Sequence, residues 1–489
     1  MAAFIDETLR DGPQSLWATR VNTRTVLEAA TLIDRTGVAR ATAASGATFE
    51  TAVRFLKEDP WERLRRTRGC LARTPMEVLI RGRNLFGWSR YPDEVVRLLL
   101  QCLQRAGTDH VKVFDGLNDI EAIAAHCRIA KELGLGVTGM LTFSLSPVHT
   151  DAHFAAKARR YAELGVDAVL LCDASGILRP ERARTVLAAI RQAVGPQMPI
   201  EFYAHASMGL AHDSYREALR SGVAAVTTAA LPLANGESLP DTAGIARIAA
   251  ELGLDSGLDT AAVESLDDYM SWATYREGHQ PGAQMQFDPA RYERFVGHQI
   301  PGGMISNFRN QLREAGLMHR LDEVLAEAAR VRSELGYPVM VTPFSQFVGV
   351  QAVFNVIQGE RYRTVPDEVR QFALGHYGST DAPIDPNVLD RILQGRSAGP
   401  VPTDALHGEP MLDALKRAHG PFACDEDLLL QLFYGRPAIE ALKASAAPAH
   451  DVRLLPPLHV LIAELARRPG LRQVAVSRPG LRLEMAYTC

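Results

Sequence analysis

Five polar side chains follow short apolar runs, at points where β-strands would end. Asp11 and Gln14 follow the first run, and Arg81, Asp115 and His205 follow the third, fourth and seventh runs. They supply carboxylate, amide, guanidinium and imidazole groups, which can hold an anion, a metal ion or a proton. If the runs are the parallel strands of one barrel, these side chains collect at the carboxyl face, where barrel active sites lie.

A cysteine, Cys172, ends the sixth apolar run, VDAVLL. With Asp11 and His205 it could form a three-ligand zinc site that keeps an open position, because a thiolate is a soft ligand suited to Zn²⁺. Alternatively, Cys172 is a small apolar residue of the barrel interior, and His205 is a hydrogen-bonded core histidine. The residue types alone leave both interpretations open.

Helix-to-strand junctions recur along the first half of the chain and would position these side chains. In each, a helical pattern ends on a glycine and a short apolar run follows. Glycine suits the left-handed position that closes many helices. Strands that alternate with helices in this way imply βαβ units and a parallel sheet. The glycines are Gly37, Gly107, Gly134, Gly165 and Gly222.

Eight strands are expected from this pattern. Eight strand–helix repeats within about 250 residues are typical of a TIM (β/α)8 barrel. We therefore predict an α/β fold with such a barrel, and a doubly wound sheet is the alternative. The expected strands are residues 3–7, 38–44, 77–81, 110–114, 137–143, 168–172, 200–204 and 224–228.

The rest of the chain is expected to be mainly helical. We predict three domains: the barrel at 1–284, a helical domain at 285–400, and residues 401–489 with a linker, helices and a small appendage. The linker is placed near 397–410 because that stretch contains proline and glycine. The appendage is expected to be one helix followed by a hairpin with a basic face, suited to docking.

Composition excludes several classes of protein. The net charge of −4 provides no basic surface, so nucleic acid is not an expected partner. No apolar run approaches the roughly 18 residues of a membrane helix. The N-terminus lacks the pattern of a signal peptide, so we expect a cytoplasmic protein. Six scattered cysteines without a CxxC spacing indicate neither a disulfide framework nor a zinc knuckle.

A series of motifs carries a resemblance to a known family. The segment ETLRDGPQSLWATR resembles the opening of the carboxyltransferase domain of pyruvate carboxylase, the oxaloacetate decarboxylase alpha subunit and the central transcarboxylase subunit. The resemblance spans about residues 4–400. It continues in GATFETAVRFLKEDPWERLR, LIRGRNLFGW, FDGLND, TFSLSPVHT, HQIPGGMISNFRNQL and ELGYPVMVTPFSQFVGVQAVFNVIQGERY.

This resemblance implies a TIM barrel with a helical funnel above its mouth, and an enzyme that moves CO2 between biotin and pyruvate or oxaloacetate. It implies a divalent metal that polarises the keto acid. Asp11 and His205 match two of the metal ligands. Arg81 matches the arginine that binds the substrate carboxylate, and Gln14 and Arg10 match their motif neighbours. Asp115 of FDGLND is retained, and His149 and His298 belong to motifs that we interpret as scaffold.

Several family positions are changed. Cys172 replaces a metal-binding lysine that is normally carbamylated, and Tyr203 replaces the first histidine of an HxH pair. Glu237 stands where the family places a proton-relaying threonine. Three possibilities remain for the metal: a rewired zinc site, a weak site of the family type, or no tightly bound metal. Glu237 could be a general base if burial raises its pKa, or it could be a solvated loop residue or a partner of Arg10.

Trp88 stands for a tyrosine, Thr42 for a glutamate and Ala44 for a tryptophan. The chain has no biotin-attachment motif and no ATP-grasp domain. We therefore expect a biotinylated carrier and a biotin carboxylase on other chains, together with self-association.

The favoured hypothesis is a carboxyltransferase or decarboxylase that acts on a 2-oxo acid through an enolate. Arg81, Gln14 and Asp115 would bind the substrate, and Arg10, Gln14 and Glu237 would act in catalysis. The alternatives are a catalytically silent subunit of a carboxylase-like complex and a repurposed biotin-independent decarboxylase or lyase.

Overall fold

The structure is a computed structural model of the chain. It describes residues 1–300, 312–313, 316–393, 411–445, 465, 473–478 and 481–486. The chain divides into two compact units, Met1–Ala447 and Pro448–Cys489.

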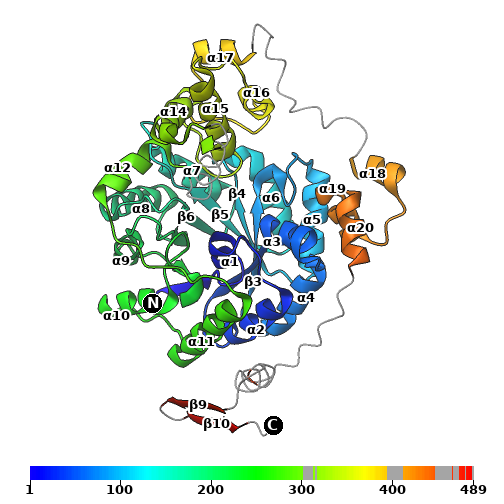
Figure 1. Cartoon of the computed structure of the whole chain (residues 1–489), viewed down its shortest axis with the longest axis vertical. Helices are drawn as coiled ribbons and strands as arrows, with labels where there is room; N and C mark the ends of the chain where they lie inside the picture. The colour runs from blue at the N-terminus through cyan, green and yellow to red at the C-terminus, as the bar shows by residue number, and fades with distance from the viewer. Residues whose placement is uncertain are drawn as a thin grey trace. The chain divides into compact units, whose positions relative to one another are not determined.

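Eight parallel strands form a closed barrel at the centre of the first unit (Figure 1). Each strand pairs with the next, and β1 closes the barrel against β8 through the pairs from Ala3↔Ala225 to Asp6↔Thr228. The TIM barrel is therefore confirmed, with every strand end within two residues of its expected place, and the doubly wound alternative is wrong. The strands are β1 (Ala3–Asp6), β2 (Arg40–Ser45), β3 (Met76–Arg81), β4 (His110–Phe114), β5 (Gly136–Thr142), β6 (Ala168–Asp173), β7 (Ile200–Ala204) and β8 (Ala225–Thr228).

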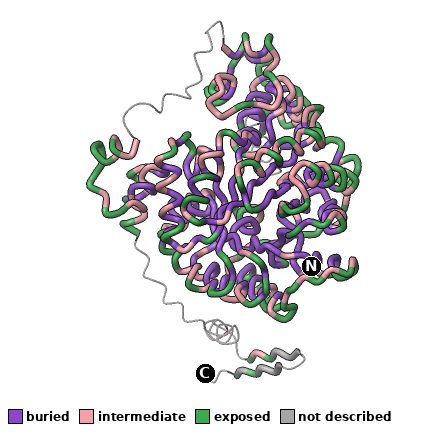
Figure 2. Tube along the Cα trace, turned by 180° about the vertical axis from the view of Figure 1, so that it is seen from behind, coloured by how far each residue is buried: buried purple, intermediate pink, exposed green. Residues whose placement is uncertain are grey.

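Amphipathic helices surround the barrel and bury their apolar faces against it (Figure 2). The five junction glycines have φ between 72° and 91°, the left-handed conformation that was expected of them. The helices of this part are α1 (Asp11–Leu16), α2 (Thr23–Ile33), α3 (Gly46–Thr51), α4 (Pro60–Cys70), α5 (Asp93–Arg105), α6 (Ile120–Glu132), α7 (Asp151–Glu163), α8 (Pro180–Val194), α9 (Ala211–Arg220), α10 (Thr242–Glu251) and α11 (Thr260–Glu277).

Short helical turns complete the connections between these elements. They are η1 (Ala52–Leu56), η2 (Gly82–Asn84) and η3 (Leu231–Leu233).

Charged side chains form a buried network among the barrel strands. The Nζ of Lys112 lies 2.9 Å from Glu7 and 2.7 Å from Glu77, and none of these three side chains is exposed. Arg40 extends the network, since it pairs with Glu77 at 3.1 Å and with Glu201 at 2.6 Å. Opposite charges therefore compensate one another where solvent is absent, as buried charges require.

A helical region with its own apolar core follows the barrel (Figure 1). The core is formed mainly by α14 and α15, with Val331, Val348 and Val369 among its fully buried members. The elements of this region are α12 (Pro289–His298), η4 (Met318–Arg320), α14 (Leu321–Glu334), α15 (Phe344–Gln358), α16 (Asp367–Ala373) and α17 (Pro386–Leu393).

Three further helices, α18 (Met411–His419), α19 (Asp425–Tyr434) and α20 (Arg436–Ala444), belong to the same compact unit as the barrel. The Phe433 ring of α19 packs against Tyr91 at 5.2 Å, and Asp425 pairs with Arg105 of α5 at 2.9 Å. The domain boundaries at 284 and 400 remain a prediction.

In the second unit, the expected hairpin is formed by β9 (Gln473–Arg478) and β10 (Leu481–Ala486), which pair in antiparallel fashion. Most of the helix that was expected to precede it, and nearly all of the linker near 397–410, lie outside the described residues. Within the described ranges, no helix has the length and apolar character needed to cross a membrane.

Candidate active site

A cavity of about 340 Å³ opens at the carboxyl ends of the barrel strands. Seven of the eight candidate residues line it, so the barrel brings together side chains that are scattered over more than 200 positions of sequence. The seven are Arg10, Asp11, Gln14, Arg81, Cys172, His205 and Glu237.

The turn between β1 and α1 places Arg10 and Asp11 at the cavity. The amides of Arg10, Asp11 and Gly12 all donate to the carbonyl of Glu7, which fixes this turn tightly. Gly12 is required there, because a Cβ at this position would lie 2.7 Å from the Cβ of Leu233. The short helix α1 then begins at Asp11 and carries Gln14 along the same edge of the mouth.

Arg10 joins the cavity to the charged network below it. Its Nε donates to Glu7 at 2.6 Å and its Nη1 donates to Asp11 at 2.8 Å. Burial by itself would raise the pKa of Asp11, but the charges of Arg10 and His205 outweigh it and hold this pKa well below its usual range. Asp11 is therefore an anion that both Arg10 and His205 stabilise.

His205 uses one ring nitrogen for two contacts. Its Nε2 lies 2.9 Å from Asp11 Oδ2 and 2.9 Å from the hydroxyl of Tyr203. Burial opposes the charged form of His205, but Asp11 favours it more strongly and raises the pKa of the imidazole. Burial raises the pKa of Tyr203 far above its ordinary value, so the phenol stays protonated.

Cys172 lies beside Tyr203, because the two are paired neighbours on β6 and β7. It belongs to an apolar cluster with Leu79 and Met140. Burial raises the pKa of its thiol far above the usual value, which disfavours the thiolate that metals bind. Within the described part of the chain, Cys172, Asp11 and His205 do not place their donor atoms within 4.8 Å of one another. The structure therefore brings Asp11 and His205 together without Cys172.

Arg81, the last residue of β3, presents a half-buried cation to the cavity. Its Nη2 donates to the carbonyl of Gly87 at 2.7 Å, and its guanidinium lies 4.7 Å from the Trp88 ring centre. Its Nε is buried and has no hydrogen-bond partner. Burial lowers the pKa of Arg81, although an arginine remains charged. Among the residues that the structure describes, no carboxylate forms an ion pair with Arg81, so neither Asp115 nor Glu50 neutralises it.

The remaining candidates differ in their surroundings. Gln14 lines the cavity and accepts a long hydrogen bond of 3.4 Å from the Ser45 hydroxyl. Glu237 lies on the cavity wall with an exposed side chain, so it lacks the burial on which its role as general base depended.

Asp115 does not line the cavity. Its carboxylate accepts hydrogen bonds from the amides of Leu117 and Asp119, and burial raises its pKa to about 6. Its place in substrate binding remains a prediction.

The helical region also contributes to the cavity, as the implied funnel above the barrel mouth suggests, although the sequence did not indicate which residues would do so. Met340, Val341 and Thr342, just before α15, line it opposite the barrel residues. The motif VMVTPF is the only signal in the sequence that could have pointed to them, and on sequence grounds it reads as scaffold.

Comparisons with known proteins agree with this architecture. The family described as conserved carboxylase domain matches residues 296–467. A pyruvate carboxylase subunit from Methanocaldococcus jannaschii is 35% identical over 91% of this chain and 78% of its own. The methylmalonyl-CoA carboxyltransferase 5S subunit of Propionibacterium freudenreichii is 33% identical over 91% of this chain and 88% of its own.

Solved structures give the same result. The carboxyl transferase domain of Rhizobium etli pyruvate carboxylase, as the Y628A variant with pyruvate, aligns with a TM-score of 0.83. The alignment has 26% identity and covers 91% of this chain and 77% of that one. The chain therefore belongs to the carboxyltransferase family of pyruvate carboxylase and transcarboxylase, and it is a carboxyltransferase enzyme.

Proposed function

We propose that this chain transfers a carboxyl group between biotin, held on a separate carrier chain, and a 2-oxo acid such as pyruvate. The observation that carries the proposal is Arg81, a half-buried cation at the cavity whose buried Nε has no hydrogen-bond partner and which forms no ion pair to a described residue. Such a guanidinium can bind a carboxylate through two parallel hydrogen bonds. Gln14 lines the same cavity and provides an amide for the keto group.

The relatives support this choice of substrate and partners. A matching carboxyl transferase domain from Rhizobium etli was solved with pyruvate and biocytin. The Methanocaldococcus jannaschii relative is one subunit of a pyruvate carboxylase, which agrees with a carrier and a biotin carboxylase on other chains. Self-association of this chain remains a prediction.

The proposal includes a changed metal site. The donors at the barrel mouth differ from those that the family resemblance implies, because Cys172 and Tyr203 stand in place of a lysine and a histidine and offer a thiol and a phenol. The two remaining donors, Asp11 and His205, lie 2.9 Å apart, a spacing that neighbouring ligands of one ion would also have. Magnesium and manganese prefer several oxygen ligands, and this set offers them one carboxylate.

Protein groups then stabilise the negative charge of the enolate. Arg10 lines the cavity and carries five N–H groups. In its hydrogen bonds to described residues, Nε donates to Glu7 and Nη1 donates to Asp11. Donors that are fixed before the reaction stabilise developing charge effectively, because they need no reorganisation. Glu237 is exposed at the wall of the same cavity, and its role in proton transfer remains a prediction.

The decisive experiment measures decarboxylation of oxaloacetate by the purified chain in the presence of free biotin, with pyruvate followed by coupled reduction. Arg81→Ala should lower kcat/KM at least about tenfold, since hydrogen bonds to charged groups contribute roughly 1.5–3 kcal/mol each. Arg83→Ala is the matched control, because Arg83 pairs with Asp93 and does not line the cavity. Equal effects of the two substitutions would refute the assignment of Arg81.

Two further outcomes test the rest of the proposal. Manganese added to metal-depleted protein should leave kcat unchanged, and a rate that requires manganese would restore the family metal site. No turnover of oxaloacetate or pyruvate, together with tight co-purification of a homologous subunit, would identify the chain as a silent partner.

A further inference from the structure

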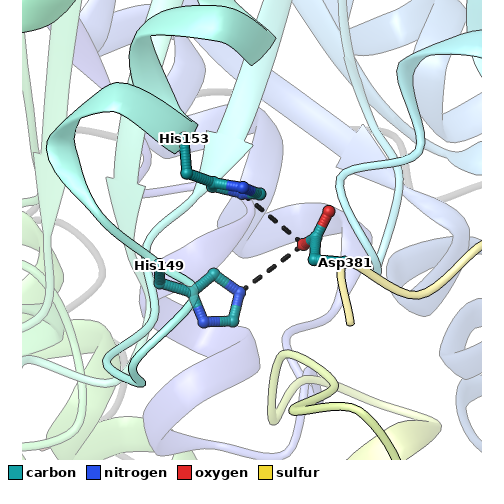
Figure 3. A group of neighbouring side chains, drawn as sticks. All are labelled: His149, His153 and Asp381. Atoms are coloured by element: carbon teal, nitrogen blue, oxygen red, sulfur yellow. Dashed lines mark ion pairs between the residues drawn. The ribbon is translucent and has the colours of Figure 1, made fainter. Parts of the chain in front are cut away.

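Two histidines and one aspartate meet away from the active-site cavity (Figure 3). His149 lies in the loop before α7, His153 lies in the first turn of α7, and Asp381 lies between α16 and α17. Both imidazole Nε2 atoms point at the same carboxylate oxygen, at 3.6 Å from His149 and 3.5 Å from His153. The three ligand atoms all lie within 4.8 Å of one another.

These contacts are too long for ordinary hydrogen bonds. An N–H···O bond has a heavy-atom distance of about 2.7–3.2 Å. Neither Nε2 has a hydrogen-bond partner, although both atoms are buried and the His149 side chain is 0% exposed. A buried polar atom without a partner requires an explanation, and an ion between the three side chains is one.

The spacing favours a tetrahedral ion. Zinc binds imidazole nitrogen and carboxylate oxygen at about 2.0–2.2 Å, so tetrahedral ligands lie about 3.3–3.5 Å apart. Octahedral neighbours around magnesium, at about 2.0–2.1 Å, lie only about 2.9 Å apart. The histidine–aspartate distances of 3.5 and 3.6 Å are close to this tetrahedral spacing, and the two imidazole nitrogens lie within 4.8 Å of each other. Two imidazoles and one carboxylate are also a donor set that suits zinc.

We propose that His149, His153 and Asp381 bind a zinc ion that ties the barrel helix α7 to the helical region. A water molecule would complete the coordination. None of the three side chains lines the active-site cavity, so the ion is structural and separate from the site of carboxyl transfer.

Neighbouring groups hold the three ligands in place. The Nδ1 of His149 lies 2.6 Å from the hydroxyl of Ser146, which orients the ring and leaves Nε2 directed at Asp381. The other carboxylate oxygen of Asp381 pairs with Lys157 at 2.8 Å.

The position of the ion gives it a mechanical role. Asp381 belongs to a segment that also contacts the barrel through the amide of Ser379, which donates to Asp119 at 3.0 Å. The same helical region provides Thr342 to the cavity wall. A zinc ion at α7 would therefore help to fix the region that closes the active site, and His149, a scaffold residue on sequence grounds, would act as a ligand.

The test is zinc binding by the full chain. Protein is stripped with a chelator, incubated with Zn²⁺ and dialysed, and the retained metal is measured. The parent should retain one zinc per chain, and His153→Gln should weaken binding by at least about 100-fold, since even the loss of an outer hydrogen bond costs 10–100-fold. His212→Gln is the matched control, because His212 also lies in the first turn of a barrel helix, 3.9 Å from Asp241. Circular dichroism verifies that both variants fold.

Cobalt provides a second measurement, because a tetrahedral Co²⁺ site absorbs visible light strongly and the band should vanish in His153→Gln. A parent that retains no zinc, or a His153→Gln variant that retains as much as the parent, would overturn the proposal. Loss of zinc in His205→Gln but not in His153→Gln would also overturn it, because the ion would then lie at the barrel mouth. These outcomes are read from binding, so they do not depend on the proposed carboxyl transfer.

Discussion

Replacement of Lys112 by methionine should destabilise the barrel strongly. Its ammonium lies between Glu7 and Glu77 at 2.9 and 2.7 Å, and all three side chains are fully buried. Removing one partner of a buried ion pair leaves an uncompensated charge and costs about 3–5 kcal/mol. Glu7 would keep Arg10 and Glu77 would keep Arg40, so we expect the lower end, about 3 kcal/mol.

Urea unfolding followed by circular dichroism measures this loss. With a slope of about 3 kcal/mol per molar urea, a loss of about 3 kcal/mol lowers the midpoint by about 1 M. Lys131→Met is the matched control. Lys131 pairs with Asp167 at 2.6 Å, but the two side chains are 42% and 44% exposed. An exposed pair of this kind contributes within about 1 kcal/mol, so its midpoint should hardly move.

A second variant tests the physical reason. In Lys112→Met/Glu77→Leu, the carboxylate that lost its partner is also removed, and part of the lost stability should return. Two results would contradict this reasoning. In the first, Lys112→Met lowers the free energy of unfolding no more than Lys131→Met does. In the second, adding Glu77→Leu to Lys112→Met lowers the free energy of unfolding further instead of restoring part of it, which would show that the charges of the barrel interior are not coupled as we infer.

Two other predictions concern the thiols and the dependence on pH. Burial raises the pKa of Cys172, whereas Cys424 is exposed. Iodoacetamide at pH 8 should therefore label Cys424 in the folded protein and spare Cys172. Early labelling of Cys172, detected by mass spectrometry, would contradict its burial. Burial also raises the pKa of Asp6 from 3.8 to about 7. Between these two pH values the folded state keeps a proton that the unfolded state has released, and this proton stabilises the fold. The contribution of Asp6 to the free energy of unfolding is therefore complete below about pH 4 and is lost as the pH rises through 7, by up to about 4 kcal/mol. In urea unfolding, the free energy of unfolding of Asp6→Asn should fall less steeply than that of the parent between pH 5 and 7.5. Parallel plots of this free energy against pH for parent and variant would contradict the assignment.

The barrel was predictable because its signals are local. Each junction pairs a glycine that ends a helix with an apolar run, and Gly107 and Gly165 show the left-handed backbone that this pattern requires. The meeting of Asp11 and His205 also follows from the sequence, since all parallel strands of a closed barrel end at one face. Their hydrogen bond of 2.9 Å is the local detail that topology alone does not provide.

Other parts of the site depend on packing that the sequence does not encode locally. The side chain of Glu237 is exposed because of the conformation of the loop after η3, which no residue pattern indicated. Asp381 reaches His149 because a segment between two helices packs on α7, and a contact between such distant positions has no periodic signal. The distance of the Cys172 sulfur from Asp11 and His205 is likewise a matter of side-chain geometry.

Protein groups compensate the charge of Asp11 at the barrel mouth. A buried carboxylate needs a compensating charge, and in a metal enzyme the ion supplies it. Here Arg10 lies 2.8 Å from one oxygen and His205 lies 2.9 Å from the other. Arg10 is in turn paired with Glu7, and Glu7 with Lys112, so positive and negative groups alternate from the barrel interior to the cavity. The charge of Asp11 is therefore balanced through a connected series of charges that begins in the barrel interior, which links the stability of the barrel to the electrostatics of the cavity.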